Sequence, residues 1–213
     1  MSILTKTKIL EKIQKGDLGF KPMIDEFQLQ GHSIDLRLGF TFMILKSWHM
    51  TPRGRESLET VHVDKYTPEY FDIIELEASQ YFDLLPDEFV LASTLEKIKI
   101  PTDLMAVLYP RSSTNRKGLS LDLTGIVDSG YEGQLVIPIR NNTRSRTVRL
   151  YPGERLCQIV LEELTENIEN NRKSKYHQRD VIDGVQKEKR DEIDFLMKGD
   201  IKGLKEKFGI KLT

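Results

Sequence analysis

The chain has few of the residues that build disulfides or metal sites. Its 213 residues include a single cysteine, Cys157, and four histidines. One cysteine excludes an intramolecular disulfide and a cysteine-rich zinc site, which favours a reducing, cytoplasmic environment. The histidines show no metal-ligand spacing, so histidine-based catalysis is not expected; they are His32, His49, His62 and His177.

Net charge and long apolar runs are also scarce. The 32 basic and 33 acidic residues give a formal net charge of −1 at pH 7, a balance without an overall nucleic-acid signature. No apolar run approaches the ~20 residues of a membrane span, and the N-terminus lacks a signal-type apolar stretch. We therefore expect a cytoplasmic protein that binds neither nucleic acid nor membrane.

What the chain does contain is a regular series of short, alternating apolar runs from residue 33 onward. They cover 33–45, 88–100, 104–110, 119–127, 133–141, 146–152 and 155–164. Such runs, separated by glycine or proline, predict a mainly β protein with a jelly-roll-like β-barrel. Residues 5–15 have helical apolar spacing behind a threonine and predict an N-terminal helix ending at Gly16. Pro138, inside the fifth run, predicts an edge strand or a bulge.

Composition divides the chain into a β domain, residues 1–165, and a charged, partly helical tail, residues 166–213. Within the first part, residues 46–85 interrupt the strand pattern and read as an insertion or an extended hairpin. In the tail, a helical stretch near 186–199 presents an apolar stripe of Ile193, Leu196 and Met197. Acidic residues interleave with the lysines, so we expect this helix to dock on a neighbouring subunit rather than on nucleic acid.

The first half of the stretch 110–133 has the residues of a phosphate grip. Arg111 offers a planar guanidinium that fits phosphate oxygens in a bidentate manner. Ser112 and Ser113 add hydroxyl donors beside whatever backbone N–H groups the turn leaves free. The alternative interpretation is an ordinary surface turn.

The second half of this stretch, GIVDSGYEG, can present a carboxylate to a sugar. Gly125 and Gly130 permit positive φ and a close approach of a ligand beside Asp128. Tyr131 can place its ring against a sugar or a base. The alternative is a hairpin corner at Ser129 and Gly130, in which the aspartate only bonds to its own turn.

Four ordered motifs resemble those of the trimeric dUTPase and dCTP deaminase superfamily. They are QGHSIDLRLG at 30–39, YPRSS at 109–113, GIVDSGYEG at 125–133 and GERLCQ at 153–158. The N-terminal helix, the long segment before residue 87 and KYHQ at 175–178 resemble the deaminase arrangement. The resemblance implies a homotrimer with sites shared between subunits, and a deoxynucleoside triphosphate, dUTP or dCTP, as the ligand.

The two branches of this superfamily carry out different chemistry. Deaminases that resemble this chain carry a glutamate ten residues after the third-motif aspartate, as the proton shuttle for water attack at cytosine C4; here that position is Pro138. The dUTPases use the third-motif aspartate, here Asp128, to orient a water that attacks the α-phosphorus. We therefore expect a dUTP diphosphatase that forms dUMP and pyrophosphate. The alternatives are a dCTP deaminase, forming dUTP or dUMP, and a nucleotide-binding regulatory protein without turnover.

The resemblance also implies roles for single residues. Asp128 would be catalytic, and Asp35 would support the hydration shell of Mg²⁺, the implied cofactor. The implied substrate-binding residues are Arg111, Ser112, Ser113, Arg116, Gly125, Tyr131, Gln158, Lys175 and Tyr176. Two of these assignments have structural alternatives: Asp35 as a strand residue paired with Arg37, and Gln158 as a satisfied sheet amide. The chain lacks the glycine-rich C-terminal arm of dUTPases, and the segment of Lys175 and Tyr176 could replace it.

Overall fold

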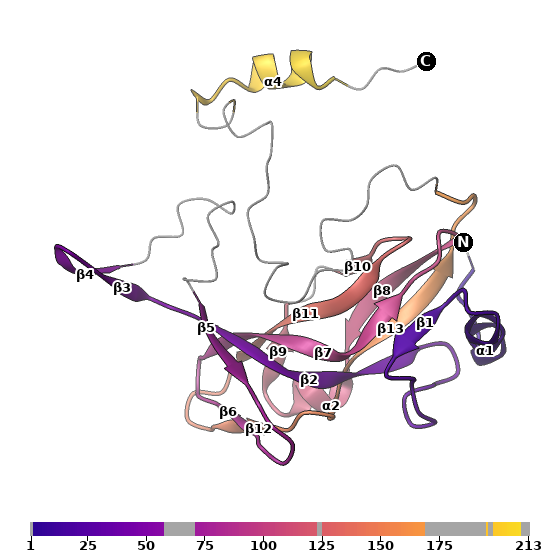
Figure 1. Ribbon diagram of the computed structural model, residues 1–213, viewed down its shortest axis with the longest axis horizontal. Coiled ribbons are helices and arrows are strands. Elements are labelled where there is room, and N and C mark those ends of the chain that lie inside the picture. Colours follow the sequence, from indigo (N-terminus) through magenta and orange to yellow (C-terminus); the bar gives the residue numbers. More distant parts are fainter. Residues whose placement is uncertain (1, 58–70, 123–124, 169–194, 196–197, 210–213) are drawn as a thin grey trace.

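A computed structural model describes residues 2–57, 71–122, 125–168, 195 and 198–209 (Figure 1). The helices are α1 (Lys6–Gln14), α2 (Ser112–Arg116) and α4 (Ile201–Lys207). The strands are β1 (Gly19–Lys21), β2 (Ile34–Leu45), β3 (Trp48–Thr51), β4 (Gly54–Ser57), β5 (Phe71–Glu75), β6 (Phe82–Leu84), β7 (Phe89–Lys99), β8 (Leu104–Pro110), β9 (Leu119–Leu121), β10 (Ile126–Val127), β11 (Glu132–Asn141), β12 (Val148–Leu150) and β13 (Arg155–Glu163). The predicted run at 119–127 thus forms two strands.

The main architecture is a curled antiparallel sheet of nine strands (Figure 1). Its order is β10-β8-β13-β2-β7-β11-β9, with β1 added to β7 and β5 added to β2. The long strand β2 connects the two parts of the sheet: its first residues pair with β13, and its later residues pair with β7 and β5. The predicted mainly β, jelly-roll-like fold with small helices at both ends is confirmed.

A glycine lies where the pairing of β2 with β7 is irregular. The β2–β7 register shifts between Leu38 and Phe42, and Gly39 lies inside this interval. A Cβ at Gly39 would meet the Oγ of Ser93 in direct overlap and the carbonyl oxygen of Thr94 at 2.8 Å. The two strands can therefore approach this closely only without a side chain at position 39.

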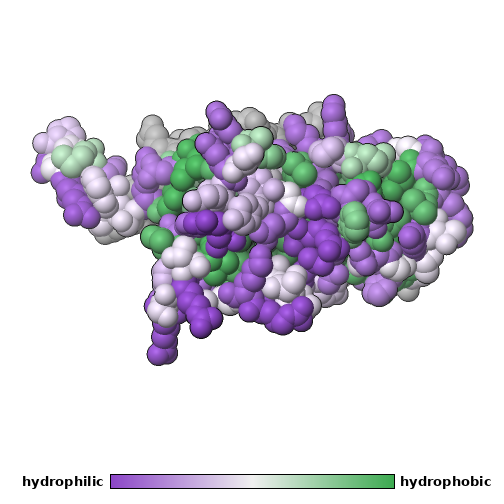
Figure 2. Space-filling model, turned by 90° about the horizontal axis from the view of Figure 1, so that it is seen from below, coloured by the Kyte–Doolittle hydropathy of each residue, from purple (hydrophilic) through white to green (hydrophobic). Residues whose placement is uncertain are grey.

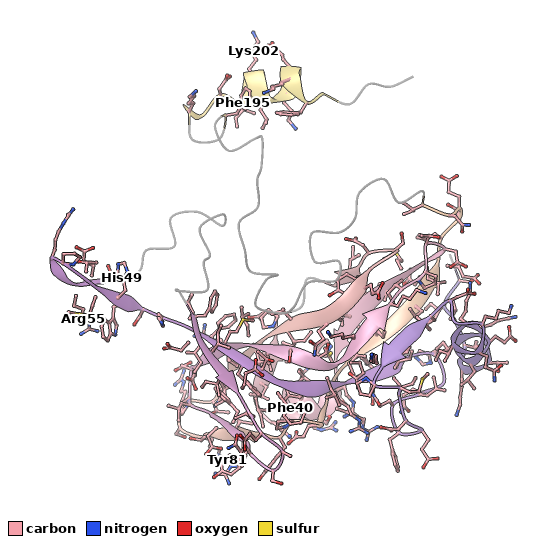
Figure 3. The ribbon with its side chains drawn as sticks, viewed as in Figure 1. Phe40, His49, Arg55, Tyr81, Phe195 and Lys202 are labelled. Carbon is pink, nitrogen blue, oxygen red and sulfur yellow. The ribbon has the colours of Figure 1, made fainter. Side chains whose placement is uncertain are left out.

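Alternating side chains fill the inside of the curl. Leu36, Leu38 and Phe42 of β2 are fully buried, and the ring of Phe42 stacks on Phe82 with centroids 4.5 Å apart. Outside this core, Tyr81 lies at the lower rim (Figure 3). The Arg149 guanidinium lies 3.6 Å from the Tyr81 ring centroid. The buried side chains at alternate positions show that the period-two pattern of the sequence marks the core face of each strand.

The prediction from Pro138 is confirmed only in part, because its strand contains a register irregularity but is not an edge strand. Its strand β11 lies between β7 and β9, and the register irregularity of β11 falls between Gln134 and Val136. The carbonyl oxygen of Pro138 accepts from the N–H of Asp122 at 3.1 Å, one residue beyond the end of β9. In a strand, the N and O of one residue point to the same side. The N–H that proline lacks would therefore fall where the β9 ladder ends.

Residues 46–57 extend away from the body of the molecule as an arm. The hairpin β3–β4 stands clear of the sheet in two views (Figures 1 and 2), and it carries His49 and Arg55 (Figure 3). The guanidinium of Arg55 lies 4.6 Å from the centroid of the half-exposed Trp48 ring. After residues outside the described part, β5 returns to pair with β2 and β6 pairs with β12.

The two ends of the described chain are helical. Helix α1 follows Thr5 as predicted, but the Thr5 side chain makes no capping hydrogen bond, and the helix is held by the fully buried Ile9. Helix α4 begins after Asp200, whose carboxylate accepts from the N–H of Gly203 at 2.9 Å. The predicted stripe of Ile193, Leu196 and Met197 lies outside the described residues. Within the described part, no helix has the length and apolarity to cross a membrane.

Candidate functional site

Three strands bring the first, second and fourth motifs together. In the register, Asp35 of β2 lies opposite Gln158 of β13, and Gln158 lies opposite Tyr109 of β8. Strand β8 ends at Pro110, directly before Arg111. The strand pairing therefore places residues from three distant parts of the chain around Asp35.

Asp35 holds two guanidinium groups with one oxygen. Its Oδ2 lies 3.0 Å from Nε of Arg111 and accepts a hydrogen bond from Nη1 of Arg155 at 3.2 Å. The Asp35 side chain is only 3% exposed, whereas the two arginine side chains are 23% and 31% exposed. Burial raises the pKa of the Asp35 carboxyl, and the two arginines oppose this shift. The guanidinium groups of Arg111 and Arg155 thus share one buried carboxylate. Together they form a cationic rim, which favours the binding of an anion.

The pairing of Asp35 with Arg37, the structural alternative, is not observed. The guanidinium of Arg37 instead binds Asp25, with Nη2 2.8 Å from Oδ2. It also donates from Nη1 to the carbonyl oxygen of Gly153 at 2.6 Å. Arg37 therefore ties the loop before β2 to the fourth motif and leaves Asp35 to the other two arginines.

Helix α2 places the serines of the second motif beside this rim. The carbonyl oxygen of Arg111 accepts from the N–H groups of Thr114 at 3.0 Å and Asn115 at 3.2 Å. The N–H groups of Ser112 and Ser113, in the first turn, have no intrahelical acceptor. The buried Thr114 hydroxyl donates to Leu156 at 2.9 Å and fixes the helix to β13. Fixed N–H groups and serine hydroxyls at this position can contact an anion.

A pocket of about 260 Å³ adjoins this helix. Its polar lining comes from Arg111, Ser113, Thr114, Lys117, Glu154 and Arg155. Nζ of Lys117 lies 2.5 Å from a carboxylate oxygen of Glu154, so these two charges compensate each other. The arginines remain the cationic part of the lining.

The third motif lies at the other end of β8. In the β10–β8 register, Val127 lies opposite Ala106, and the chain from Ala106 to Arg111 corresponds to about 17 Å at ~3.4 Å per residue. Asp128 follows Val127 and is exposed. One chain therefore does not bring the Asp128 carboxylate next to the Arg111 guanidinium.

The third motif is a tight corner. The N–H of Tyr131 donates to the carbonyl oxygen of Asp128 at 3.2 Å, and Gly130 has φ +71°. Gly125 has φ +89° and open space around an added Cβ. Tyr131 is buried, and its hydroxyl donates to the carbonyl oxygen of Gln134 at 2.6 Å. Because β10 pairs with β8 and β11 pairs with β7, the corner joins different parts of the sheet and does not close a hairpin.

The remaining expected residues differ in placement. Arg116 is exposed at the end of α2, and Gln158 is half-buried with its Oε1 3.5 Å from the Ser33 hydroxyl. Lys175 and Tyr176 lie outside the described residues. Sequence reasoning missed Arg155, although it lies in the GERLCQ motif. A charged residue in a predicted strand, three positions before Gln158, was the available signal.

The donor set around Asp35 does not fit a resident Mg²⁺ ion. The described residues contain no cluster of three or more histidine, cysteine or acidic side chains that could hold a metal. The Oδ2 of Asp35 already lies within 3.2 Å of two guanidinium groups, and these positive charges repel a nearby cation.

Comparisons with known proteins identify the family. A family model described as dCTP deaminase-like matches residues 3–164. A protein of Methanobrevibacter smithii named dCTP deaminase, dUMP-forming, is 36% identical over 169 residues, which cover 78% of this chain and 82% of the relative. A protein of Dictyoglomus thermophilum with the same name is 37% identical over 181 residues, covering 82% and 89%. The chain belongs to the dCTP deaminase-like family.

A solved structure agrees with the fold. The 2'-deoxycytidine 5'-triphosphate deaminase of Agrobacterium tumefaciens superposes with a TM-score of 0.57 at 24% identity. The match covers 75% of this chain and 48% of the other chain.

These matches correct the expectation of a dUTP diphosphatase. The relatives of 36% and 37% identity are named as dUMP-forming dCTP deaminases, which favours the alternative over the first interpretation. That interpretation gave most weight to Pro138 and to the third motif. The similarity extends across the whole β domain, including the segments before and after that motif, and so outweighs a few positions.

Proposed function

We propose that this protein converts dCTP to dUMP. In the overall reaction, dCTP and two water molecules give dUMP, ammonia and diphosphate. One water replaces the amino group at cytosine C4. The other breaks the bond between the α-phosphorus and the oxygen that bridges it to the β-phosphorus. The observation that carries the proposal is the cationic rim of Arg111 and Arg155 on Asp35, in a chain whose relatives are named for this conversion.

The rim and helix α2 have the chemistry to hold the triphosphate. Arg111 and Arg155 supply guanidinium donors held in place by the buried Asp35. Ser112 and Ser113 supply hydroxyl and backbone N–H donors at the start of α2. Several fixed donors orient the phosphates and lower the entropy cost of bringing them to the reacting groups.

The third motif supports a site shared between subunits. Asp128 is exposed and lies at the end of β8 away from Arg111. We propose a homotrimer in which Asp128 and Gly125 of one subunit contact the deoxyribose of a nucleotide whose phosphates lie on Arg111 of its neighbour. Gln158, Arg116, Tyr131, Lys175 and Tyr176 stay predicted contacts of the same nucleotide.

Magnesium, in this proposal, enters with the nucleotide. Phosphate oxygens are good Mg²⁺ ligands, and the ion usually keeps several waters in such complexes. The ion neutralises part of the triphosphate charge, while Asp35 holds the two arginines.

Pro138 favours a second candidate function, nucleotide binding without turnover. Its ring cannot transfer a proton, and it occupies the position where the deaminases that this chain resembles carry a glutamate. The side chain lies on the face of β11 opposite to the buried Ile137 and Ile139, so substitution there does not disturb the core directly.

One experiment tests both candidates. Purified protein is incubated with dCTP or dUTP, with Mg²⁺ or EDTA; the nucleotides are resolved by chromatography, ammonia is assayed, and binding is measured by calorimetry. The proposal expects dUMP and ammonia from dCTP, and loss of both in Arg111→Ala. The control Arg149→Ala removes an arginine that pairs with Asp83 and does not line the pocket. Binding of dCTP without any product supports the second candidate, and absence of binding contradicts both.

A further inference from the structure

A buried carboxylate lies behind the site, in a position that the proposed function does not use. Glu96 of β7 is 1% exposed and follows the inward-facing series of Val90, Ala92 and Thr94. Burial raises the pKa of its carboxyl. A carboxyl group at a core position costs stability unless its oxygens are satisfied, so its contacts indicate what it does.

Both oxygens of Glu96 bind groups that hold the strand of Asp35. Oε1 accepts from Nε2 of Gln28 at 2.7 Å, and Oε2 accepts from the backbone N–H of Arg37 at 3.0 Å. The same Nε2 of Gln28 donates to the carbonyl oxygen of Asp35 at 2.8 Å. The N–H of Asp35 in turn donates to the carbonyl oxygen of Gln28 at 2.8 Å. Glu96 and Gln28 therefore fix the backbone on both sides of the Asp35 side chain.

The sheet is irregular where these contacts occur. Strand β2 pairs with β7 only from Leu38 onward, opposite Thr94, and its pairing with β13 contains a bulge between Arg155 and Cys157. The Arg37 N–H falls just before the start of the β2–β7 ladder. The Glu96 carboxylate supplies the acceptor that a neighbouring strand would otherwise provide.

We propose that Glu96 is a positioning residue for the nucleotide site. Through Gln28 and the Arg37 N–H, it sets the backbone so that one Asp35 oxygen meets both Arg111 and Arg155. The affinity part of this inference rests on the proposed function, because it assumes that these arginines hold phosphates.

The variant Glu96→Gln tests this inference with little change in shape. One terminal group of the new side chain is an NH₂, which must face a donor from either Gln28 or Arg37. The matched control is Asn141→Asp, an amide-to-acid exchange at an equally buried residue. The Asn141 amide donates to Leu84 at 3.0 Å and to Arg146 at 2.8 Å, in a separate network.

The main readout is a double-mutant cycle on the affinity for dCTP and for inorganic tripolyphosphate. We expect Glu96→Gln to weaken both about tenfold, and Asn141→Asp to stay within about twofold of wild type. If Glu96 acts through Asp35, adding Glu96→Gln to Asp35→Asn weakens binding by less than about twofold more. Wild-type affinity of Glu96→Gln, or losses that multiply in the double variant, would overturn the inference.

A second readout does not depend on the proposed function. Amide hydrogen exchange at the Arg37 N–H, which Glu96 binds directly, or at the Asp35 N–H, which Glu96 supports through Gln28, should be at least about tenfold faster in Glu96→Gln than in Asn141→Asp. Equal rates at both positions would overturn the inference. If the wild type binds neither dCTP nor tripolyphosphate, the proposed function fails, and this exchange measurement still decides the role of Glu96. Should Glu96→Gln not fold, Glu96→Asp, which withdraws the carboxylate by one methylene, takes its place in both measurements.

Discussion

Asp35 and Arg111 form an ion pair in which an almost fully buried carboxylate holds a partly exposed guanidinium at 3.0 Å. Removing the charge by Asp35→Asn leaves Arg111 and Arg155 without their shared partner. Because the arginines are partly exposed and burial already disfavours the Asp35 charge, the expected loss is below that of a fully buried pair, at about 1–3 kcal/mol. Urea denaturation measures the loss.

The control for that prediction is Asp83→Asn, which breaks a pair with Arg149 at 2.7 Å on the exposed surface. Exposed ion pairs contribute little because water and salt screen them. A similar loss in both variants would contradict the view that burial makes the Asp35 pair important.

A complementation assay tests the proposal that each site is shared between two subunits. Arg111→Ala and Asp128→Asn should each be inactive as pure proteins, since each lacks one half of every site. In randomly mixed trimers, a quarter of the sites combine an intact Arg111 with an intact Asp128 of the neighbour, so we expect about a quarter of the wild-type rate. Activity is measured after mixing in denaturant and refolding together. A mixture that stays inactive, while co-refolded wild type recovers, would argue for sites within one chain.

Gly39, where the β2–β7 register shifts, is predicted not to tolerate a side chain. In Gly39→Ala the new methyl group overlaps the Ser93 hydroxyl and lies 2.8 Å from the Thr94 carbonyl oxygen. Overpacking of this kind costs about 1–3 kcal/mol. Thermal and urea unfolding should show the loss. Gly31→Ala, where nothing lies within 4 Å of the new Cβ, should unfold like the wild type.

Stability should depend on pH through Glu96. Burial raises the pKa of its carboxyl above the ordinary value of about 4.3, so the folded state keeps this proton to a higher pH than the unfolded state. The contribution of Glu96 to stability is therefore present at low pH and declines as pH rises through the window between the two pKa values. Unfolding free energies of wild type and Glu96→Gln, compared from about pH 4 to about pH 8, should show the wild type losing stability relative to the variant. A constant difference would mean that Glu96 does not titrate in this way.

Cys157 is predicted to be unreactive in the folded protein. It is fully buried, and burial raises the pKa of its thiol far above the ordinary value, so the reactive thiolate is scarce. A thiol reagent should modify no sulfur in native protein and one sulfur per chain in denaturant. Rapid modification of the native protein would show that β13 opens readily at this point.

The sequence by itself determined the main strands of the sheet and the superfamily. Alternation of apolar residues marked β7, β8, β11 and β13 closely, because the period of two records which face of each strand meets the core. Four short motifs, read together, indicated the superfamily. Single positions were less reliable guides: Pro138 led to a wrong edge assignment and to the wrong order of activities.

Tertiary structure alone decided which side chains meet. Asp35 pairs with Arg111 and Arg155 rather than with Arg37, and Glu96 supports it from β7. These contacts depend on the register between strands that are distant in the chain, and a local pattern carries no information on that register. The same pairing places Asp128 at the far end of β8 from Arg111, so the sequence could name the residues of both halves of the proposed site, whereas the fold shows that one chain holds them apart.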